Sequence, residues 1–158
     1  MKKYSKLLIA LSQVLVVSGV ISSCNNNNNG EEEKVRTLLA DLASENYQIV
    51  TPTNPSATIV SAANEIASYY FKITNKEMRV INELEASMSN DSTYISLGDT
   101  TLFASAEHDH GEIDLSSETL YGDGFIIFTH GKNVIINSCC DRGVLFGAYQ
   151  FIEETLGV

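Results

Sequence analysis

The sequence predicts an α+β domain in which a mixed β-sheet is packed by two main helices. Three observations predict it: two long segments with apolar residues at helical spacing, several short β-compatible segments, and turn residues between them. One helical segment lies near the middle of the chain and the other at its end. Both need a sheet on which to bury their apolar faces, and this arrangement is compatible with two or three layers.

The first 23 residues are expected to be a signal peptide that lies outside the domain. Three lysines precede an apolar run from Leu7 to Ile21, which is shorter than the roughly 20 residues needed to span a hydrocarbon core. The run ends in ISSC, which resembles the lipobox of bacterial lipoproteins, so Cys24 is the candidate lipidation site. A plain signal peptide with an incidental cysteine is the alternative. Two or more acyl chains would anchor the protein to the membrane essentially permanently.

Residues 24–44 are expected to form a tether behind the lipidated cysteine. Asn25 follows Cys24, as in lipoproteins of the outer membrane, so we expect an envelope protein that faces the periplasm or the cell surface. The stretch NNNNNGEEE is too polar to order itself. It resembles the acidic surface-export signals of some lipoproteins, and a solvated spacer is the alternative. The segment VRTLLADLASEN then has the spacing of a short amphipathic helix, although TLL could extend a strand.

The charge of the chain excludes one class of partner. The net charge is −10, and removal of the signal peptide would take away three lysines and no acidic residue, leaving −13. Binding to nucleic acid depends on a basic surface that neutralises phosphates, so we do not expect a nucleic-acid partner. Recognition of an anionic sugar would need a local arginine or lysine.

The ordered domain is expected over residues 45–158 and begins with a short strand, YQIVTP. A long helix follows, with Asn54 as its cap and Pro55 at its first position. Asn75 suits the left-handed residue that ends a helix. The apolar stripe of this helix consists of Ile59, Val60, Ala63, Ile66, Ala67, Tyr70 and Ile73.

The strands of the sheet follow the long helix. MRVINELE and TYISLGDT are β-compatible and are separated by the loop ASMSND. After a less regular stretch, GFIIFTHGKNVIINS predicts a hairpin whose two-residue turn is Gly131 and Lys132.

The closing helix is expected to begin at Asp141 as its cap and to end at Gly157. Gly143 and Gly147 lie one turn apart and permit a close approach to the sheet. We expect Arg142 to pair with a carboxylate or a carbonyl group, because the cap aspartate already occupies the anion site of the helix start. The buried face consists of Val144, Leu145, Ala148, Phe151 and Ile152.

The segment EHDHGE holds the potential metal ligands of the chain. In an extended segment His108 and His110 would share one face, as two ligands of a zinc ion would. No H-E-x-x-H or C-x-x-C pattern supplies further ligands, so the two histidines are weak candidates and a solvated loop is the expected structure. His130, alone at a turn, is a weaker candidate still.

The remaining residue types give no catalytic constellation. The adjacent Cys139 and Cys140 are too close for an unstrained disulfide and would point to opposite faces of a strand. Packing at a strand end is the expected role of this pair, with a redox or metal role as the alternative. The sequence has no Ser-His-Asp order, phosphate-binding glycine loop or evident carboxylate pair. We therefore predict no catalytic residue, no metal and no cofactor.

Three segments together carry a family resemblance: NPSATIVSAANEIASYYFKITN, YISLGDT, and the stretch from GFIIF to the end. From about Tyr47 onward the chain resembles the accessory N-terminal domain that precedes the barrel in family 67 α-glucuronidases and family 20 β-N-acetylhexosaminidases. The chain departs from the pattern at Asn75, where glycine is usual, and at Ser138 to Cys140, where a Gly-Gly pair is common. The most specific motif matches at Arg142, Gly143, Leu145, Phe146, Gly147, Tyr149, Phe151, Glu153, Leu156 and Gly157.

The resemblance implies the mixed sheet of the hexosaminidase accessory fold, which is zincin-like in topology but lacks the zinc motif. In the resembled enzymes a (β/α)₈ barrel follows the closing helix and carries the catalytic carboxylates. We therefore expect a non-catalytic front domain of a glycosidase, truncated or a fragment, that is inactive alone and whose partner is its missing barrel. A stand-alone surface lipoprotein that binds glycan or a partner protein is the main alternative, and a metal protein built on EHDHGE is a weaker one.

Overall fold

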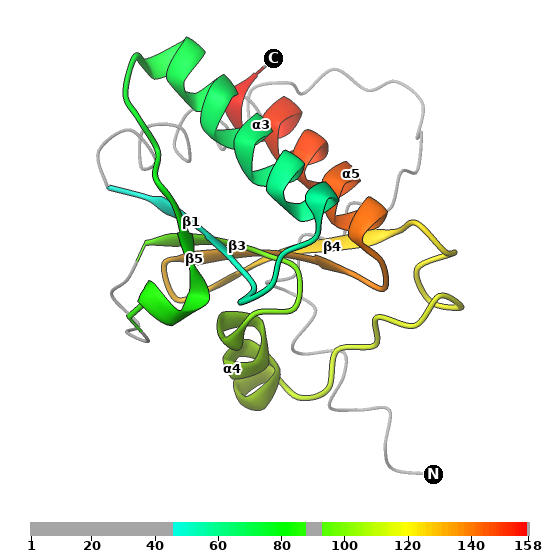
Figure 1. Ribbon diagram of the computed structural model, residues 1–158. Helices are drawn as coiled ribbons and strands as arrows, with labels where there is room; N and C mark the ends of the chain where they lie inside the picture. Colours follow the sequence, from blue (N-terminus) through cyan, green and yellow to red (C-terminus); the bar gives the residue numbers. More distant parts are fainter. Residues whose placement is uncertain (1–45, 88–92, 158) are drawn as a thin grey trace, which may run out of the picture.

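The computed structural model describes residues 46–87 and 93–157. The expected signal peptide, Cys24, the tether and the short helix after it lie outside the described residues, as does most of the ASMSND loop. In the rest of the chain a five-stranded sheet has helices on both faces (Figure 1). The described helices include none that is long and apolar enough to cross a membrane.

The sheet is mixed, as predicted, and its strand order is β2-β1-β3-β5-β4. β1 pairs in parallel with β2 and β3, β3 pairs in parallel with β5, and β4 and β5 form an antiparallel hairpin. The two-residue turn at Gly131 and Lys132 is confirmed, with Gly131 at a φ of 59°. The strands are β1 (Gln48–Thr51), β2 (Val80–Asn82), β3 (Tyr94–Leu97), β4 (Phe125–His130) and β5 (Asn133–Ser138).

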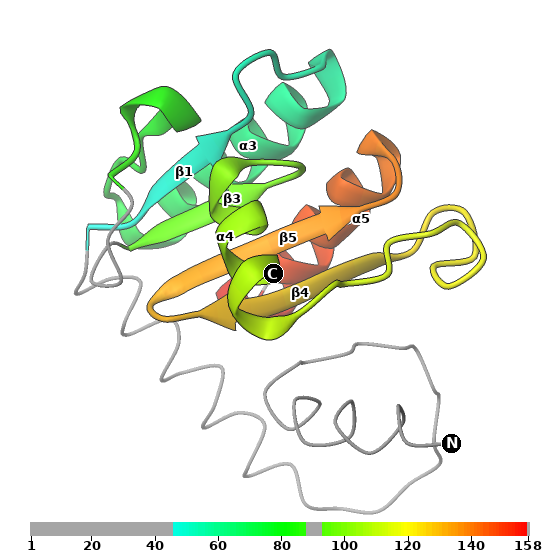
Figure 2. The same cartoon turned by 90° about the horizontal axis from the view of Figure 1, so that it is seen from below.

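Three α-helices pack on this sheet. α3 (Ala57–Thr74) and α5 (Asp141–Phe151) cover one face, and α4 (Thr101–His110) covers the other. Figure 2 shows α4 in front of β3 and β5. The α+β prediction is confirmed, and the architecture has three layers. The short elements are the 3₁₀ helix η1 (Glu83–Glu85) and the π-helical turn η2 (Ile152–Leu156), which continues α5.

The alternation of the strands divides the core between the two faces. Ile49 and Ile95 pack under α3 and α5, whereas Val50 and Ile135 pack against α4. Because both faces are covered, the central strands are apolar on both sides, as expected of parallel strands. Tyr94 to Leu97, the whole of β3, is buried.

The capping residue of α3 is Ser56 and not Asn54. The Ser56 side chain accepts a hydrogen bond from the Ile59 N–H at 3.2 Å, so Pro55 lies before the cap. Asn75 ends the helix in the left-handed region at a φ of 54°, as predicted. Most of the predicted apolar stripe is buried or partly buried, but Val60 and Ile73 are about two-fifths exposed.

α4 was not predicted and replaces part of the stretch expected to be irregular. Thr100 caps it by accepting a hydrogen bond from the Phe103 N–H at 3.2 Å. Its buried residues are Leu102, Phe103 and Ala106, and the second half of the helix is charged. An apolar face of three residues on a ten-residue helix gives too weak a periodicity to distinguish it from a loop.

The second predicted strand is shorter than MRVINELE. Only Val80–Asn82 pairs in the sheet, and Glu83–Glu85 form η1. The Asn82 side chain accepts a hydrogen bond from the Leu84 N–H at 3.0 Å, while the Glu85 carboxylate accepts one from the Asn82 N–H at 3.5 Å. This local capping turns the chain out of the sheet.

α5 is capped by Cys140 and not by Asp141. The Cys140 Sγ accepts a hydrogen bond from the Gly143 N–H at 3.4 Å, and Asp141 is the first helical residue, where its charge still suits the helix dipole. Gly157, at a φ of 69°, ends the continuation of the helix as predicted. The predicted inner face is confirmed, with Leu145 only partly buried.

The two glycines of α5 allow the close approach that the sequence predicted. A Cβ on Gly143 would lie 2.0 Å from the Ser138 Oγ and 2.8 Å from the Gly124 carbonyl oxygen. A Cβ on Gly147 would lie 2.6 Å from Cγ2 of Ile136. The backbone of α5 therefore rests directly on β5 and on the residue that leads into β4.

We predict that Gly143→Ala lowers the free energy of unfolding by roughly 1–3 kcal/mol. The new methyl group meets a backbone carbonyl that no rotamer change can move away, and this outweighs the gain of about 1 kcal/mol in helix propensity. Urea unfolding followed by circular dichroism measures the change. Ser68→Ala on the exposed face of α3 is the control and should cause no loss. Equal stability of both variants would contradict the close packing of α5.

Candidate functional site

The first turn of α5 carries an ion pair with the loop that precedes β4. The Arg142 Nε donates to Oδ1 of Asp123 at 2.9 Å, and Nη2 donates to Oδ2 of the same carboxylate. These hydrogen bonds and the charge of the guanidinium lower the pKa of Asp123, while the carboxylate raises the pKa of Arg142. The prediction that Arg142 pairs with a carboxylate is confirmed. The sequence did not identify Asp123 as the partner.

The loop that carries Asp123 presents an aromatic side chain to solvent. Tyr121 is 94% exposed and has a φ of 52°, a left-handed conformation that is uncommon for a residue with a side chain. Two backbone hydrogen bonds hold the turn around it, from the Gly122 N–H to Ser117 O at 3.0 Å and from the Gly124 N–H to Leu120 O at 2.7 Å. Figure 2 shows this loop, in yellow, projecting beyond the end of β4.

The two adjacent cysteines lie beside this ion pair and are both free thiols. They follow β5, so the expected alternation across a strand does not apply. The Sγ atoms of Cys139 and Cys140 lie 3.2 and 3.4 Å from the same acceptor, the carbonyl oxygen of Gly122. Cys139 is exposed, so the predicted packing role is wrong for this residue.

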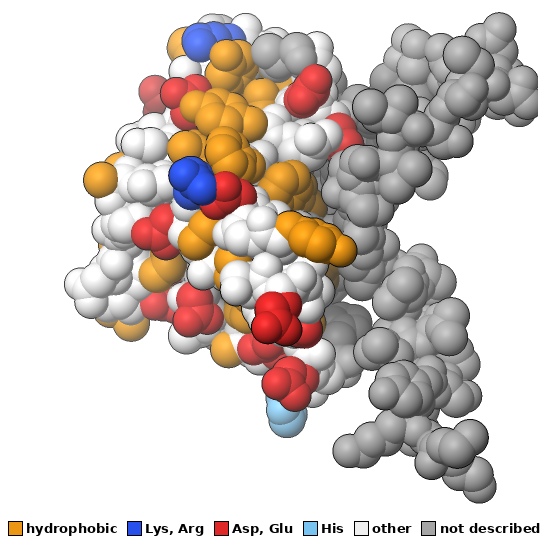
Figure 3. Space-filling model, turned by 90° about the vertical axis from the view of Figure 1, so that its right-hand side faces the viewer, with side chains coloured by type: hydrophobic (Ala, Val, Ile, Leu, Met, Phe, Trp, Pro, Cys, Tyr) orange, Lys and Arg blue, Asp and Glu red, His pale blue; other side chains and the backbone are white. Residues whose placement is uncertain are grey.

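An exposed stripe runs along α5 on the side opposite its buried face. It consists of Arg142, Phe146 and Tyr149, which are four and three residues apart and therefore share one side of the helix. Phe146 and Tyr149 are 43% and 45% exposed. Figure 3 shows hydrophobic side chains gathered in a band on the upper part of the molecule, where α3 and α5 lie. Burial in the core therefore does not account for these two aromatic residues.

The helical spacing of this stripe was the signal that could have identified it. Phe146 and Tyr149 alternate along the chain with the apolar positions Val144, Ala148 and Phe151. A helix that buries those three positions must therefore expose the stripe. All three stripe residues also belong to the specific motif quoted above. The other residues expected to shape the closing helix lie as follows: Gly143 and Gly147 pack on the sheet, Asp141 is the first residue of α5 and Gly157 ends η2.

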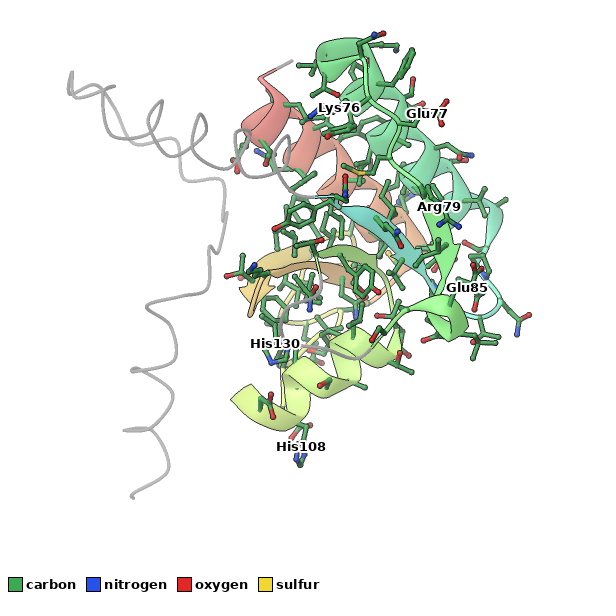
Figure 4. The ribbon with its side chains drawn as sticks, turned by 90° about the vertical axis from the view of Figure 1, so that its left-hand side faces the viewer. Lys76, Glu77, Arg79, Glu85, His108 and His130 are labelled. Atoms are coloured by element: carbon green, nitrogen blue, oxygen red, sulfur yellow. The ribbon has the colours of Figure 1, made fainter. Side chains whose placement is uncertain are left out.

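The histidine-rich segment is not an extended loop. Glu107 to His110 form the last turn of α4. The prediction that His108 and His110 share one face assumed an extended backbone, and this segment is helical. His108 is exposed and points away from the sheet (Figure 4). No group of three His, Cys, Asp or Glu side chains is placed to hold a metal ion within residues 46–87 and 93–157.

His130 has a partner that the sequence did not indicate. Its Nε2 lies 2.9 Å from the Asp109 Oδ2, so the end of β4 is joined to the last turn of α4. The His130 side chain is mostly buried and that of Asp109 is about half exposed. The pair connects two elements and belongs to no group of three potential metal ligands among the described residues.

The carboxylate of Glu83 fills the position where a sheet of this kind would bind a ligand. β2 and β3 lie on either side of β1, so the chain leaves β1 and β3 in opposite directions. In an open α/β sheet, ligands usually bind at the carboxyl ends of two strands whose connections diverge in this way. Here Oε1 of Glu83 accepts hydrogen bonds from the Thr53 N–H and hydroxyl, both at 2.6 Å. Oε2 accepts one from the Thr101 N–H, at the start of α4, at 2.8 Å.

The shifted pKa values argue against an acid catalyst at these positions. Three carboxyl groups have a lowered pKa: Glu83 through Thr53 and Thr101, Asp114 through Thr119 and Ser116, and Asp123 through Arg142. The general acid of a glycosidase needs a raised pKa, because it must hold its proton near neutral pH. These three groups are held as structural carboxylates.

Comparison with known families gives one match. Residues 31–151 match the family model described as "Glycosyl hydrolase family 67 N-terminus". The matched range spans well over half of the chain and includes every strand of the sheet and α5. No curated protein gives a significant match to the chain.

We predict that Glu83→Gln removes a pH-dependent part of the stability. Because the folded-state pKa of Glu83 lies below its unfolded value, its contribution is present above the unfolded pKa and is lost as the pH falls through the folded pKa. At pH 7 the variant should be less stable by roughly 1–3 kcal/mol, the range for hydrogen bonds to a charged group.

The difference in stability between the native chain and Glu83→Gln should shrink as the pH falls below 4.5, the ordinary pKa of a glutamate side chain. Urea unfolding at pH 7, 5, 4 and 3 measures it. Glu118→Gln, at an exposed position, is the matched charge control and should show no such dependence. A constant difference between the native chain and Glu83→Gln over this pH range would contradict the structural role of the carboxylate.

Proposed function

We infer the function of this chain from its family: it belongs to the glycosyl hydrolase family 67 N-terminal domains, and we propose that it is a non-catalytic domain of a carbohydrate-degrading glycoside hydrolase. The family match is the observation that carries this proposal. The chemistry of the described residues supports it, because the shifted carboxyl groups are ionised and the crevice at the ends of β1 and β3 is closed by Glu83.

We propose that the parent enzyme is of the α-glucuronidase or β-N-acetylhexosaminidase type and that a separate barrel carries its catalytic carboxylates. In this view the chain is the front part of a larger enzyme. The exposed stripe of Arg142, Phe146 and Tyr149 supports a docking role, since aromatic residues and arginine are enriched in the cores of protein interfaces. A lipid on Cys24 would hold the assembly at the outer membrane, on its periplasmic or outer side.

The first test is an activity assay on the purified chain with aryl-glucuronide and aryl-N-acetylhexosaminide substrates. We expect no turnover above a heat-inactivated control, because the proposal places the catalytic carboxylates on a separate barrel and the pKa values of Glu83, Asp114 and Asp123 are lowered rather than raised. Hydrolysis above that control by the native chain would overturn the proposal of a non-catalytic domain.

The gene provides the test of the parent enzyme. We expect the DNA downstream of codon 158, in the same frame or a shifted one, to encode a (β/α)₈ barrel with two catalytic carboxylates. Unrelated sequence there would contradict the proposal of a parent enzyme with a catalytic barrel and would favour the alternative that follows.

The alternative is a stand-alone surface lipoprotein that binds glycan or a partner protein. One observation favours glycan: Tyr121 is almost fully exposed in a backbone conformation that costs free energy, and such residues are concentrated at functional sites. An exposed aromatic ring offers an apolar face for a sugar ring and a hydroxyl group for its polar edge.

Isothermal titration calorimetry tests glycan binding with glucuronic acid-bearing xylan fragments and chitin fragments. If the alternative holds, the native chain gives saturable heat, Tyr121→Phe retains it and Tyr121→Ala loses it, because stacking needs the ring and not the hydroxyl group. Absence of saturable heat with both sets of fragments, or an unchanged affinity of Tyr121→Ala, would contradict glycan binding at this residue.

A further inference from the structure

The adjacent thiols of Cys139 and Cys140 converge on one side of the chain. Their Sγ atoms lie 3.2 and 3.4 Å from the Gly122 carbonyl oxygen, so a single acceptor atom lies within hydrogen-bonding distance of both. The two thiols therefore face one and the same acceptor. Since Cys139 is exposed and Cys140 is partly exposed, solvent reaches the pair.

The surrounding structure holds Cys140 in place. Cys140 Sγ accepts the Gly143 N–H as the cap of α5, and the Cys140 N–H donates to the Ser138 Oγ at 3.3 Å. The Ser138 hydroxyl in turn donates to the Gly124 carbonyl at 2.6 Å. These contacts are made by buried or partly buried groups at the tight junction of α5 with the sheet, so the Cys140 thiol is positioned before any ligand arrives. The Cys139 thiol lies against the same Gly122 carbonyl.

We propose that Cys139 and Cys140 form a bidentate dithiol site for a soft, thiophilic ion of the trivalent arsenic type. Thiolates select soft ions, and an ion that bridges two sulfur atoms avoids bringing them to bonding distance. A disulfide between neighbouring residues, in contrast, would be strained, because their Cα atoms are about 3.8 Å apart and disulfides normally need at least about 4.4 Å.

The neighbouring groups also select against a zinc site. Asp123 Oδ1 lies 3.8 Å from the Cys140 Sγ, but both oxygens of this carboxylate accept hydrogen bonds from Arg142. Zinc needs three or four protein ligands, and no group of three potential ligands is found in the part of the chain that the structure describes. Trivalent arsenic that already carries one bound group needs only two thiolates from the protein, so it fits this arrangement.

Phenylarsine oxide is the probe for the site. Each thiol sulfur forms a bond to arsenic, the bond between arsenic and oxygen breaks, and the oxygen leaves as water with the two thiol protons. The reaction needs neither an oxidant nor a reductant. The weak S–H hydrogen bonds to the Gly122 carbonyl and to the Asp123 Oδ1 are lost, and the Gly143 N–H can continue to donate to the Cys140 sulfur.

The experiment uses the full chain with Cys24→Ser, so that Cys139 and Cys140 are the two remaining cysteines. The reduced protein is mixed with one equivalent of phenylarsine oxide in excess 2-mercaptoethanol, and its intact mass is measured. We expect one phenylarsenic group per chain, with loss of two hydrogen atoms, stable to the monothiol and removed by 2,3-dimercaptopropanol. The matched variants Cys139→Ser and Cys140→Ser should each lose the adduct under these conditions.

Serine is a favourable helix cap, so Cys140→Ser removes a ligand without removing the cap of α5. Circular dichroism of each variant should show the native helix content. Absence of the adduct in the folded, reduced Cys24→Ser chain would overturn the inference, as would equal retention of the adduct in either single variant. A chain that is purified lighter by two hydrogen atoms and binds the probe only after reduction would also overturn it, because the pair would then be a disulfide.

Discussion

The close contact of α5 with the hairpin of β4 and β5 is the constraint on which the rest of the domain depends. Gly143 leaves no room for a methyl group against Ser138 and the Gly124 carbonyl, and Gly147 leaves none against Ile136. This approach brings the loop before β4 beside the first turn of α5. The pairing of Asp123 with Arg142 and the convergence of both thiols on Gly122 follow from it, because all of these groups flank the same junction.

The position of Glu83 shows why the fold alone does not define a function here. A sheet whose connections diverge at β1 and β3 has the geometry of a ligand crevice, yet the carboxylate of Glu83 occupies this point and satisfies the backbone N–H groups of Thr53 and Thr101. The Glu83 carboxylate therefore joins η1 to the loop after β1 and to the start of α4 at the place where a ligand would otherwise bind. The functions that we propose for the described residues therefore rest on surface features, the stripe on α5 and the junction beside it.

The elements with strong periodicity could be predicted from the sequence, and those with a weak pattern could not. The stripe through Ile59, Ala63 and Ile66 identified α3, and the glycines of α5 predicted its contact with the sheet. α4 was missed because its apolar face is short and its second half is charged. The predicted caps, Asn54 and Asp141, were wrong by two residues and one residue. The observed caps are Ser56 and Cys140, and several polar residues near each helix start could have made the same kind of hydrogen bond.

The sequence by itself determined the mixed α+β class, the hairpin at Gly131, the inner faces of α3 and α5, and the family, because periodicity, turn residues and motif spacing are local properties. Only the tertiary structure decided which distant residues meet. Asp123 with Arg142, Asp109 with His130, and Glu83 with Thr53 and Thr101 are separated by 18 to 30 residues, and each pair depends on how the elements stack. Local patterns specify which face of an element is buried, whereas the partner across the contact is fixed only when the layers pack.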